Sequence, residues 1–229
     1  MAGFYKLQEQ NIVGRTQHIR VRLRFQKTGV LKFISHHDLM RLFERAIRRA
    51  DIPIGMSQGF NPRPKMSFPS ALALGIEAVD EILELELSRW IAPERLQEQL
   101  QAQLAPGIRI ISAEPITPGS PSRVDALVYQ IKWDLPEELT RKKINQLLAE
   151  KKIQILRKRK GGKRLFDLRP SIVSITLENS TLLLKLRPTG DGTARPDEVL
   201  KALGLEMDTG RTPRIIRSAV HLSPSNGAN

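Results

Sequence analysis

A strict alternation of apolar and basic residues constrains this chain more than any other feature. The apolar residues are Ile19, Val21, Leu23 and Phe25, and the residues between them are Arg20, Arg22 and Arg24. A period of two predicts a β-strand with one buried face and one charged face. The chain therefore needs a sheet with one covered side, and the segments that follow must provide the cover.

Helical periodicity follows this strand. Ser35 can cap a helix, with Asp38 three residues later as its carboxylate partner. An apolar stripe at helical spacing continues to Ala50, and Pro53 closes the helix. The later elements expected in this half are a strand at 81–88, a helix from Pro93 and a short strand at 108–111.

The same order of elements returns after a linker at 115–124, which is rich in proline and serine. The elements expected there are a strand at 127–133, a helix at 136–149, a strand at 152–159, a hairpin of 171–178 with 181–187, a helix at 195–203 and a strand at 213–222. We therefore predict an α+β fold of two tandem ferredoxin-like (split β-α-β) domains. The predicted divisions are a flexible leader at 1–18, domains at 19–114 and 125–222, and a tail at 223–229.

The charge balance points to an anionic partner. Lys+Arg number 37 and Asp+Glu number 24, which gives a formal net charge of +13. A surplus of this size indicates nucleic acid, an anionic membrane surface or an acidic protein. Aromatic residues make up only 5%. RNA is therefore the first choice, bound by shape and phosphate contacts more than by a sheet of stacking aromatics.

Several other classes are excluded or disfavoured. The chain has no cysteine, so disulfides, thiolate nucleophiles and Cys-ligated zinc or iron–sulfur centres are excluded within it. No apolar run approaches the roughly 20 residues of a membrane helix, and the first residues do not resemble a signal peptide. We expect a cytoplasmic protein without membrane contact, metal site or cofactor.

The pair His36-His37, followed by Asp38, begins the first predicted helix. A helix N-terminus attracts phosphate, and a histidine there can transfer protons near neutral pH. His36 and Asp38 are therefore candidate catalytic residues. Under the alternative interpretation, Asp38 caps the helix, one histidine is on the surface and the other packs.

The segment 57–67, rich in glycine, proline and asparagine, is a candidate binding loop. Gln58, Phe60 and Asn61 could contact nucleotides, while Arg63 and Lys65 could hold phosphates. A rigid hairpin with solvated charges is the alternative. We favour a functional loop, because polar, aromatic and cationic groups converge within nine residues.

A run of six cations surrounds Gly161-Gly162 in the second half. Its members are Arg157, Lys158, Arg159, Lys160, Lys163 and Arg164. On a hairpin they would form a projecting basic arm for an anion, whereas the alternative is a solvated turn. The glycine-containing segment 187–197 leads into a helix, but it lacks the Gly-Lys-Ser/Thr ending of a P-loop.

Three stretches of the chain resemble a bacterial family of radical SAM-linked proteins. They are FISHHDLMRLFERA at 33–46, SQGFNPRPKMSF at 57–68 and SALALGIE at 70–77, and the likeness covers most of 19–222. His37 departs from the family pattern, where an apolar residue is expected. This makes His36 the better candidate of the two histidines.

The resemblance implies a protein that accompanies a radical SAM enzyme, and the family domain has no known function. The absence of cysteine means that this chain cannot itself hold the iron–sulfur cluster of such an enzyme. Three hypotheses follow. The first is an RNA-binding accessory protein, in which Arg20, Arg22, Arg24, Arg41, Arg45 and the loop and arm residues hold RNA. The second is a metal-independent RNA-processing or RNA-modifying enzyme using His36, and the third is a protein-docking module for the radical SAM partner.

Overall fold

A computed structural model of the protein describes residues 19–117, 122–132, 136–159, 162–205 and 213–223. The predicted leader at 1–18 lies outside these ranges, as does the predicted tail after Ser223. None of the helices in the described residues is long and apolar enough to cross a membrane.

The described elements form a mixed α+β fold, which confirms this part of the prediction. The first half contains β1 (Ile19–Lys27), η1 (Gly29–Phe33), α2 (His36–Arg49), β2 (Met66–Ser67), β3 (Glu77–Leu87), α3 (Pro93–Gln101) and β4 (Ile108–Ile116). The second half contains β5 (Val124–Lys132), α4 (Glu137–Ala149), β6 (Gln154–Arg159), β7 (Gly162–Asp167), η2 (Arg169–Ser171), β8 (Ile172–Glu178), β9 (Thr181–Leu186), β10 (Pro188–Thr189), β11 (Gly192–Thr193), α5 (Pro196–Ala202) and β12 (Ile215–Leu222).

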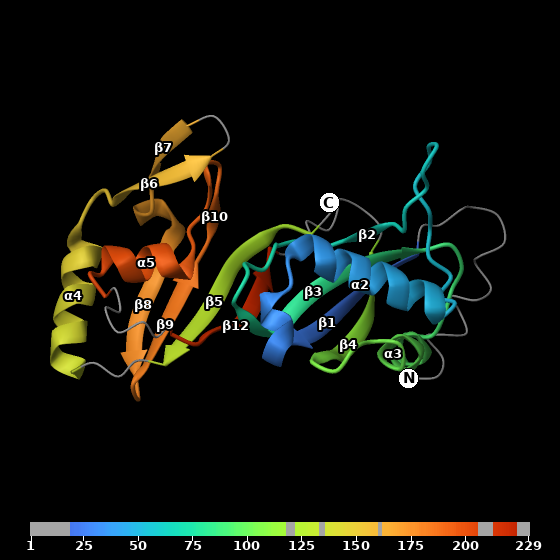
Figure 1. The fold of residues 1–229 in the computed structure, drawn as a ribbon. Helices are drawn as coiled ribbons and strands as arrows, with labels where there is room; N and C mark the ends of the chain where they lie inside the picture. The colour runs from blue at the N-terminus through green and yellow to red at the C-terminus, as the bar shows by residue number, and fades with distance from the viewer. Residues whose placement is uncertain (1–18, 118–121, 133–135, 160–161, 206–212, 224–229) are drawn as a thin grey trace.

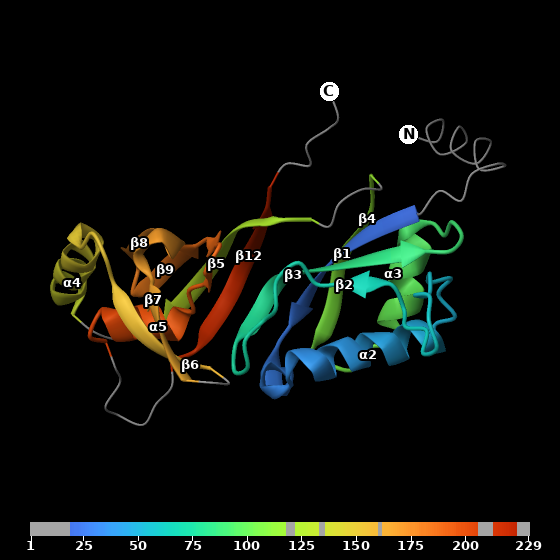
Figure 2. The same ribbon diagram turned by 90° about the horizontal axis from the view of Figure 1, so that it is seen from above.

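Strands from both halves join in one eight-stranded sheet of order β4-β1-β3-β12-β5-β9-β8, with β2 paired to β3. The junction is the parallel pairing of β12 with β3, and the other pairings in this sheet are antiparallel. β5 and β12 therefore occupy the middle of the molecule and connect its halves (Figure 1, Figure 2). The finer prediction, two tandem ferredoxin-like domains with the stated boundaries, stays a prediction.

The helices of the first half cover the apolar face of its strands. Phe25 of β1 lies 5.0 Å from Phe43 of α2, ring centroid to ring centroid, in an edge-on arrangement. The same core contains apolar residues of β3, α3 and β4. Burying each large apolar side chain contributes about 1.5–3 kcal/mol, so this face fixes α2 on the sheet. The arginines that alternate with the apolar residues of β1 consequently lie on the opposite face.

The second core also crosses the junction between the halves. It contains buried residues of α4, α5 and the strands β5, β8 and β9, together with Leu72, Ile76, Ala78 and Ile82 from the first half. β3 begins at Glu77, earlier than the predicted 81. Boundaries beside the predicted linker differ as well. β4 continues to Ile116 because Arg20 of β1 pairs with it, so the predicted linker begins inside a strand. β5 begins at Val124, earlier than the predicted 127.

Candidate nucleic-acid interface

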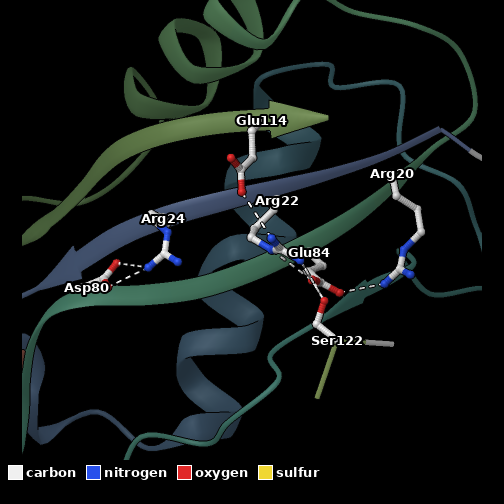
Figure 3. Close-up of polar contacts among 7 residues, drawn as sticks. All are labelled: Arg20, Arg22, Arg24, Asp80, Glu84, Glu114 and Ser122. Atoms are coloured by element: carbon white, nitrogen blue, oxygen red, sulfur yellow. Dashed lines mark hydrogen bonds and ion pairs between the residues drawn. The ribbon is translucent and has the colours of Figure 1, made fainter. Parts of the chain in front are cut away.

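The three arginines of β1, here named the β1 row (Arg20, Arg22 and Arg24), contact carboxylates of the neighbouring strands. Arg20 Nη2 lies 2.7 Å from Glu84 Oε2, and Arg22 Nη2 lies 3.1 Å from Glu84 Oε1. Arg24 Nη1 lies 2.6 Å from Asp80 Oδ1 (Figure 3). The side chain of Glu84 is only 1% exposed, so these ion pairs satisfy a buried carboxylate.

The register of the sheet explains this arrangement. Arg22 lies directly opposite Glu84 in the β1–β3 ladder, and it also reaches Glu114 of β4 at 3.2 Å. The hydroxyl of Ser122 donates to Glu84 as well, which brings the segment before β5 onto this face (Figure 3). Opposite charges placed across a ladder attract each other. The predicted phosphate contacts of the β1 row would therefore require these ion pairs to open.

A second row of basic side chains follows the solvent side of α2. This α2 row comprises His37, Arg41, Arg45 and Arg48, which are all exposed. Their spacing of four, four and three residues places them on one stripe, opposite the buried residues of the helix. Arg41 Nη1 lies 3.9 Å from Asp38 Oδ1, with both side chains more than half exposed. The other members make no ion pair with a described residue. Arg41 and Arg45 were predicted from the sequence, whereas His37 and Arg48 were not assigned to this surface.

The predicted binding loop is the tip of an arm held against β3. Gly55 N donates to Glu86 O at 2.7 Å, and a Cβ at Gly55 would lie 3.0 Å from that oxygen. A larger residue at this position would have to push the β3 backbone away, so glycine favours this close approach. Ser57 N donates to Arg63 O at 2.8 Å, and Arg63 N donates to Ser57 Oγ at 3.0 Å. These bonds fix both ends of the 57–63 loop.

The predicted ligands of this loop differ in their surroundings. Phe60 is fully exposed at 106%, and Gln58, Asn61 and Arg63 are also exposed. Lys65 instead lies outside the tip and pairs with Glu86 at 2.5 Å. The tip thus presents an aromatic ring, two amides and one guanidinium to solvent, and Lys65 is occupied by the carboxylate of β3.

The 57–63 loop belongs to the segment that follows α2, the helix that carries the α2 row. The arm leaves the C-terminal end of the helix, while η1 precedes the N-terminal end (Figure 1, Figure 2). Arg41 and Arg45 therefore lie on the helix between η1 and the arm. The β1 row lies on the other face of the sheet, so the predicted nucleic-acid ligands of this half are divided between two faces.

The histidine pair lies at the far end of α2 from the loop. Ser35 Oγ accepts from Asp38 N at 3.1 Å and its hydroxyl donates to Asp38 Oδ2 at 2.7 Å, which confirms the predicted cap. The hydrogen bond from Ser35 lowers the pKa of Asp38. The His36 ring meets the edge of Phe68 at 5.3 Å, and its Nδ1 is buried without a hydrogen-bond partner among the described residues. Burial lowers the pKa of His36 below 6.5. His36 and the loop lie at opposite ends of α2, a helix of 14 residues that is about 21 Å long.

A buried ionic group joins the two halves beside this helix end. Arg217 of β12 donates from Nη1 to Glu81 Oε2 at 3.2 Å and from Nη2 to Ala71 O at 2.8 Å. Lys27, Glu81 and Arg217 are each at most 2% exposed. Burial raises the pKa of Glu81 to about 7 and lowers the pKa of Lys27. Sequence reasoning missed this group, because each member occupies an ordinary position in a strand and the strands meet only in the folded sheet.

The predicted basic arm is the two-stranded β6–β7 hairpin. Two of its cations form ion pairs with carboxylates outside the hairpin. Arg157 donates to Glu198 Oε1 at 2.7 Å and stacks 3.5 Å from the centroid of the Phe166 ring. Arg164 Nη2 lies 2.8 Å from Asp191 Oδ1. These contacts connect the arm to the 187–197 segment, two features that the sequence presented separately.

The outer face of this hairpin carries the remaining described cations. Lys158 lies opposite Lys163 in the ladder, and both are exposed. The adjoining pair on that face is Leu156 and Leu165, which are 55% and 59% exposed. Lys160 and the side chain of Arg159 lie outside the described residues.

Within the described ranges, no group of three or more His, Asp or Glu side chains is arranged to hold a metal ion.

Comparisons with known proteins show the family of the chain. No curated protein matches it. A solved structure described as "an Unknown Protein from Galdieria sulphuraria" shares 16% sequence identity, with 90% of this chain and 99% of that chain covered and a TM-score of 0.28. Residues 20–196 match a family described as "Uncharacterized protein conserved in bacteria (DUF2344)". The matched segment makes up most of the chain, and the protein therefore belongs to this family of conserved bacterial proteins.

Proposed function

We propose that this protein binds single-stranded RNA along α2 and acts as a non-catalytic accessory protein in the cytoplasm, working with a radical SAM enzyme in RNA or ribosome-related modification. The observation that carries the RNA-binding part is the fully exposed Phe60 on a hydrogen-bonded loop that follows α2, the helix carrying the α2 row. An aromatic ring can stack on any base, and neighbouring cations can hold the phosphates between bases.

The chemistry of the 57–63 loop favours single-stranded RNA over a duplex. Gln58 and Asn61 offer amide donors and acceptors on either side of Phe60, and such groups read the edges of unpaired bases. Arg63 lies in the same tip and can contact a phosphate. A base can stack on Phe60 only if it is unpaired and can separate from the adjacent bases, as in a single strand.

The charges of this surface support the same ligand. Arg41, Arg45, Arg48 and Arg63 are exposed, and Arg41 alone among them has an ion pair with a described residue. That pair is long and solvated, so it contributes little and opens easily. Four phosphate contacts would give a salt dependence of about −3 in log K against log salt concentration for a single strand.

Fluorescence anisotropy with a labelled single-stranded RNA tests the proposal. On a strand of about 12 nucleotides, we expect Phe60→Ala to weaken binding by about 5- to 150-fold, corresponding to the loss of one stacked base at about 1–3 kcal/mol. Leu139→Ala is the matched control, because Leu139 is an exposed apolar residue of α4 in the other half. Absence of RNA binding at about 50 mM salt, where electrostatic binding is strong, would refute the proposal. Equal affinities of the Phe60 and Leu139 variants would also count against it.

The link to a radical SAM enzyme is supported by the sequence resemblance alone. Co-purification with the radical SAM enzyme of the same cell tests this link. The experiment is done with and without ribonuclease treatment. An association that survives ribonuclease would indicate direct contact, and one that disappears would indicate a shared RNA.

One observation favours a protein-docking role for the second half. Leu156 and Leu165 form an exposed apolar pair beside Lys158 and Lys163, and apolar residues bordered by charges are typical of protein interfaces. Replacing both leucines with serine should reduce binding of the radical SAM partner and leave RNA affinity unchanged. Val173→Ser, another exposed apolar position in this half, is the control.

Catalysis by His36 has weaker support. Its ring packs on Phe68, its Nδ1 is buried, and it lies at the opposite end of α2 from the 57–63 loop. If the protein processed RNA with His36, His36→Ala would abolish turnover and preserve affinity.

We also infer that each half is a split β-α-β unit of the ferredoxin-like kind. In the first half β1 lies between β4 and β3, and β2 pairs with β3. In the second half β5 lies between β12 and β9, and β8 pairs with β9. Each unit would contain two helices, and β6–β7 would be an insertion into the second.

A further inference from the structure

Three large apolar side chains are exposed just before the N-terminal end of α2. Val30 and Phe33 of η1 are 80% and 64% exposed, and Leu74 in the segment before β3 is 64% exposed. A hydrogen bond from Gly75 N to Lys32 O, 2.8 Å long, holds the two segments together. These residues therefore form one apolar surface on a fixed backbone, here named the η1 patch (Val30, Phe33 and Leu74).

A cation lies directly beside the aromatic ring of this patch. Lys32 Nζ is 5.1 Å from the centroid of the Phe33 ring and 3.8 Å from Glu77 Oε1. Glu77 has a second partner, because Arg214 Nη2 lies 2.6 Å from its other oxygen. Since Arg214 can neutralise Glu77 alone, Lys32 can turn to a phosphate without leaving that carboxylate unpaired.

The η1 patch and the 57–63 loop lie at opposite ends of the α2 row. Phe33 precedes the capping residue Ser35 by two positions, and Phe60 lies on the arm that leaves the other end of the helix (Figure 1, Figure 2). Each end thus combines an exposed phenylalanine with a cation, Lys32 in one case and Arg63 in the other. The arginines of the α2 row lie between the two.

We infer that Phe33 is a second base-stacking site, so that one RNA strand extends along α2 from Phe33 to Phe60 with its phosphates on the α2 row. This inference rests on the proposed RNA-binding function and adds the length and path of the ligand. α2 has 14 residues and is about 21 Å long. At about 3.4 Å per stacked nucleotide, a strand of about 3 nucleotides is too short to occupy both sites, whereas one of about 12 nucleotides reaches both.

Binding at two connected sites has a measurable signature. On the longer strand, removal of either ring should weaken binding by about 5- to 150-fold, because each base is held by its own ring and the strand links the two. On the shorter strand, loss of one ring should cost only about twofold, because the strand can move to the remaining site.

The experiment compares Phe33→Ala, Phe60→Ala, the double variant and Leu139→Ala by fluorescence anisotropy on single-stranded RNAs of about 3 and about 12 nucleotides. Phe33 is mostly exposed, so its replacement should not unfold the protein, and circular dichroism with thermal unfolding verifies this. We expect each single variant to be weak on the longer strand, close to wild type on the shorter strand, and the double variant to be weak on both.

The outcomes separate this inference from the proposed function. If Phe60→Ala weakens binding of the longer strand and Phe33→Ala behaves like Leu139→Ala, the second site is refuted while RNA binding stands. The η1 patch would then be a surface for a protein partner. If the wild-type protein binds neither strand, both the function and the second site are refuted.

Discussion

The two arginine rows of the first half have the same residue type and opposite surroundings. In the β1 row, Arg20 and Arg22 are bound to Glu84, whose side chain is 1% exposed. In the α2 row, the single described ion pair joins Arg41 to Asp38 at 3.9 Å in full contact with solvent. The strand row therefore contributes ion pairs to the fold, whereas the helix row is exposed to solvent, as the proposed RNA contact requires.

The difference arises from what each element places next to its cations. A strand inside a sheet has neighbours on both sides, and β3 and β4 present Asp80, Glu84 and Glu114 to the β1 row. Among the described residues, the arginines of the α2 row form an ion pair only with Asp38 of the same helix. A count of charges along the chain therefore overstates the cations available to RNA.

Removing the central carboxylate of the β1 row should have the largest effect. Glu84→Gln leaves Arg20 and Arg22 largely buried with one charged partner fewer, and breaking a buried ion pair costs about 3–5 kcal/mol. We expect the free energy of unfolding, measured in urea, to fall by that order. Glu44→Gln on α2 is the control and should change it by less than about 0.5 kcal/mol, because Glu44 has no described ion pair. A small loss for Glu84→Gln would show that the β1 row is not structural.

Lys27, the last residue of β1, is a buried cation, unlike the partly exposed arginines of the β1 row. Lys27, Asp80 and Arg217 surround Glu81, and burial raises the pKa of Glu81 from 4.5 to about 7. The folded state therefore binds this proton more tightly than the unfolded state, so stability decreases as pH rises from about 4.5 to about 7. The decrease amounts to about 3 kcal/mol at most, at 1.36 kcal/mol for each pKa unit.

Urea unfolding of wild type and Glu81→Gln across this pH range measures the effect. Glutamine cannot titrate, so the stability of the wild type relative to the variant should decline between about pH 4.5 and about pH 7 and level off above it. Contributions from His36 are present in both proteins and cancel in the difference. A difference that is independent of pH would indicate that Glu81 has an ordinary pKa.

Neutralising the α2 row should affect binding more than folding. Arg41→Gln with Arg45→Gln removes two phosphate contacts, which should weaken RNA binding about tenfold near physiological salt and reduce the salt slope by about 1.4. The matched control is Lys142→Gln with Lys151→Gln, which removes two exposed charges in and beside α4. Equal losses in both double variants would mean that RNA responds to net charge alone.

Local patterns predicted the elements well. The period of two found β1, the Ser35 cap placed the start of α2, and the turn at 178–180 located the β8–β9 hairpin. Asn179 and Ser180 have positive φ angles there, as tight hairpin turns require. These features depend on residues that are close in sequence, and the sequence contains all of the relevant information.

Local sequence patterns could not predict the pairing of strands that are distant in sequence. The sequence shows acids at Asp80 and Glu84, but only the ladder register places them beside the β1 row. The parallel pairing of β12 with β3 joins residues such as Arg217 and Ala78, which no local pattern connects. The candidate site was found in part for the same reason. Its loop and two arginines belong to contiguous motifs, whereas the η1 patch depends on the hydrogen bond from Gly75 N to Lys32 O, which joins two separate segments.

The central position of β12 has a consequence for synthesis on the ribosome. β12 lies between β3 and β5 and pairs with both strands. Until residues 215–222 have emerged from the ribosome, neither strand has this partner. A nascent chain would expose two unpaired strand edges, which invite association with other chains. Ribosome-bound chains halted before Ile215 should therefore recruit chaperones more strongly than chains released after Leu222.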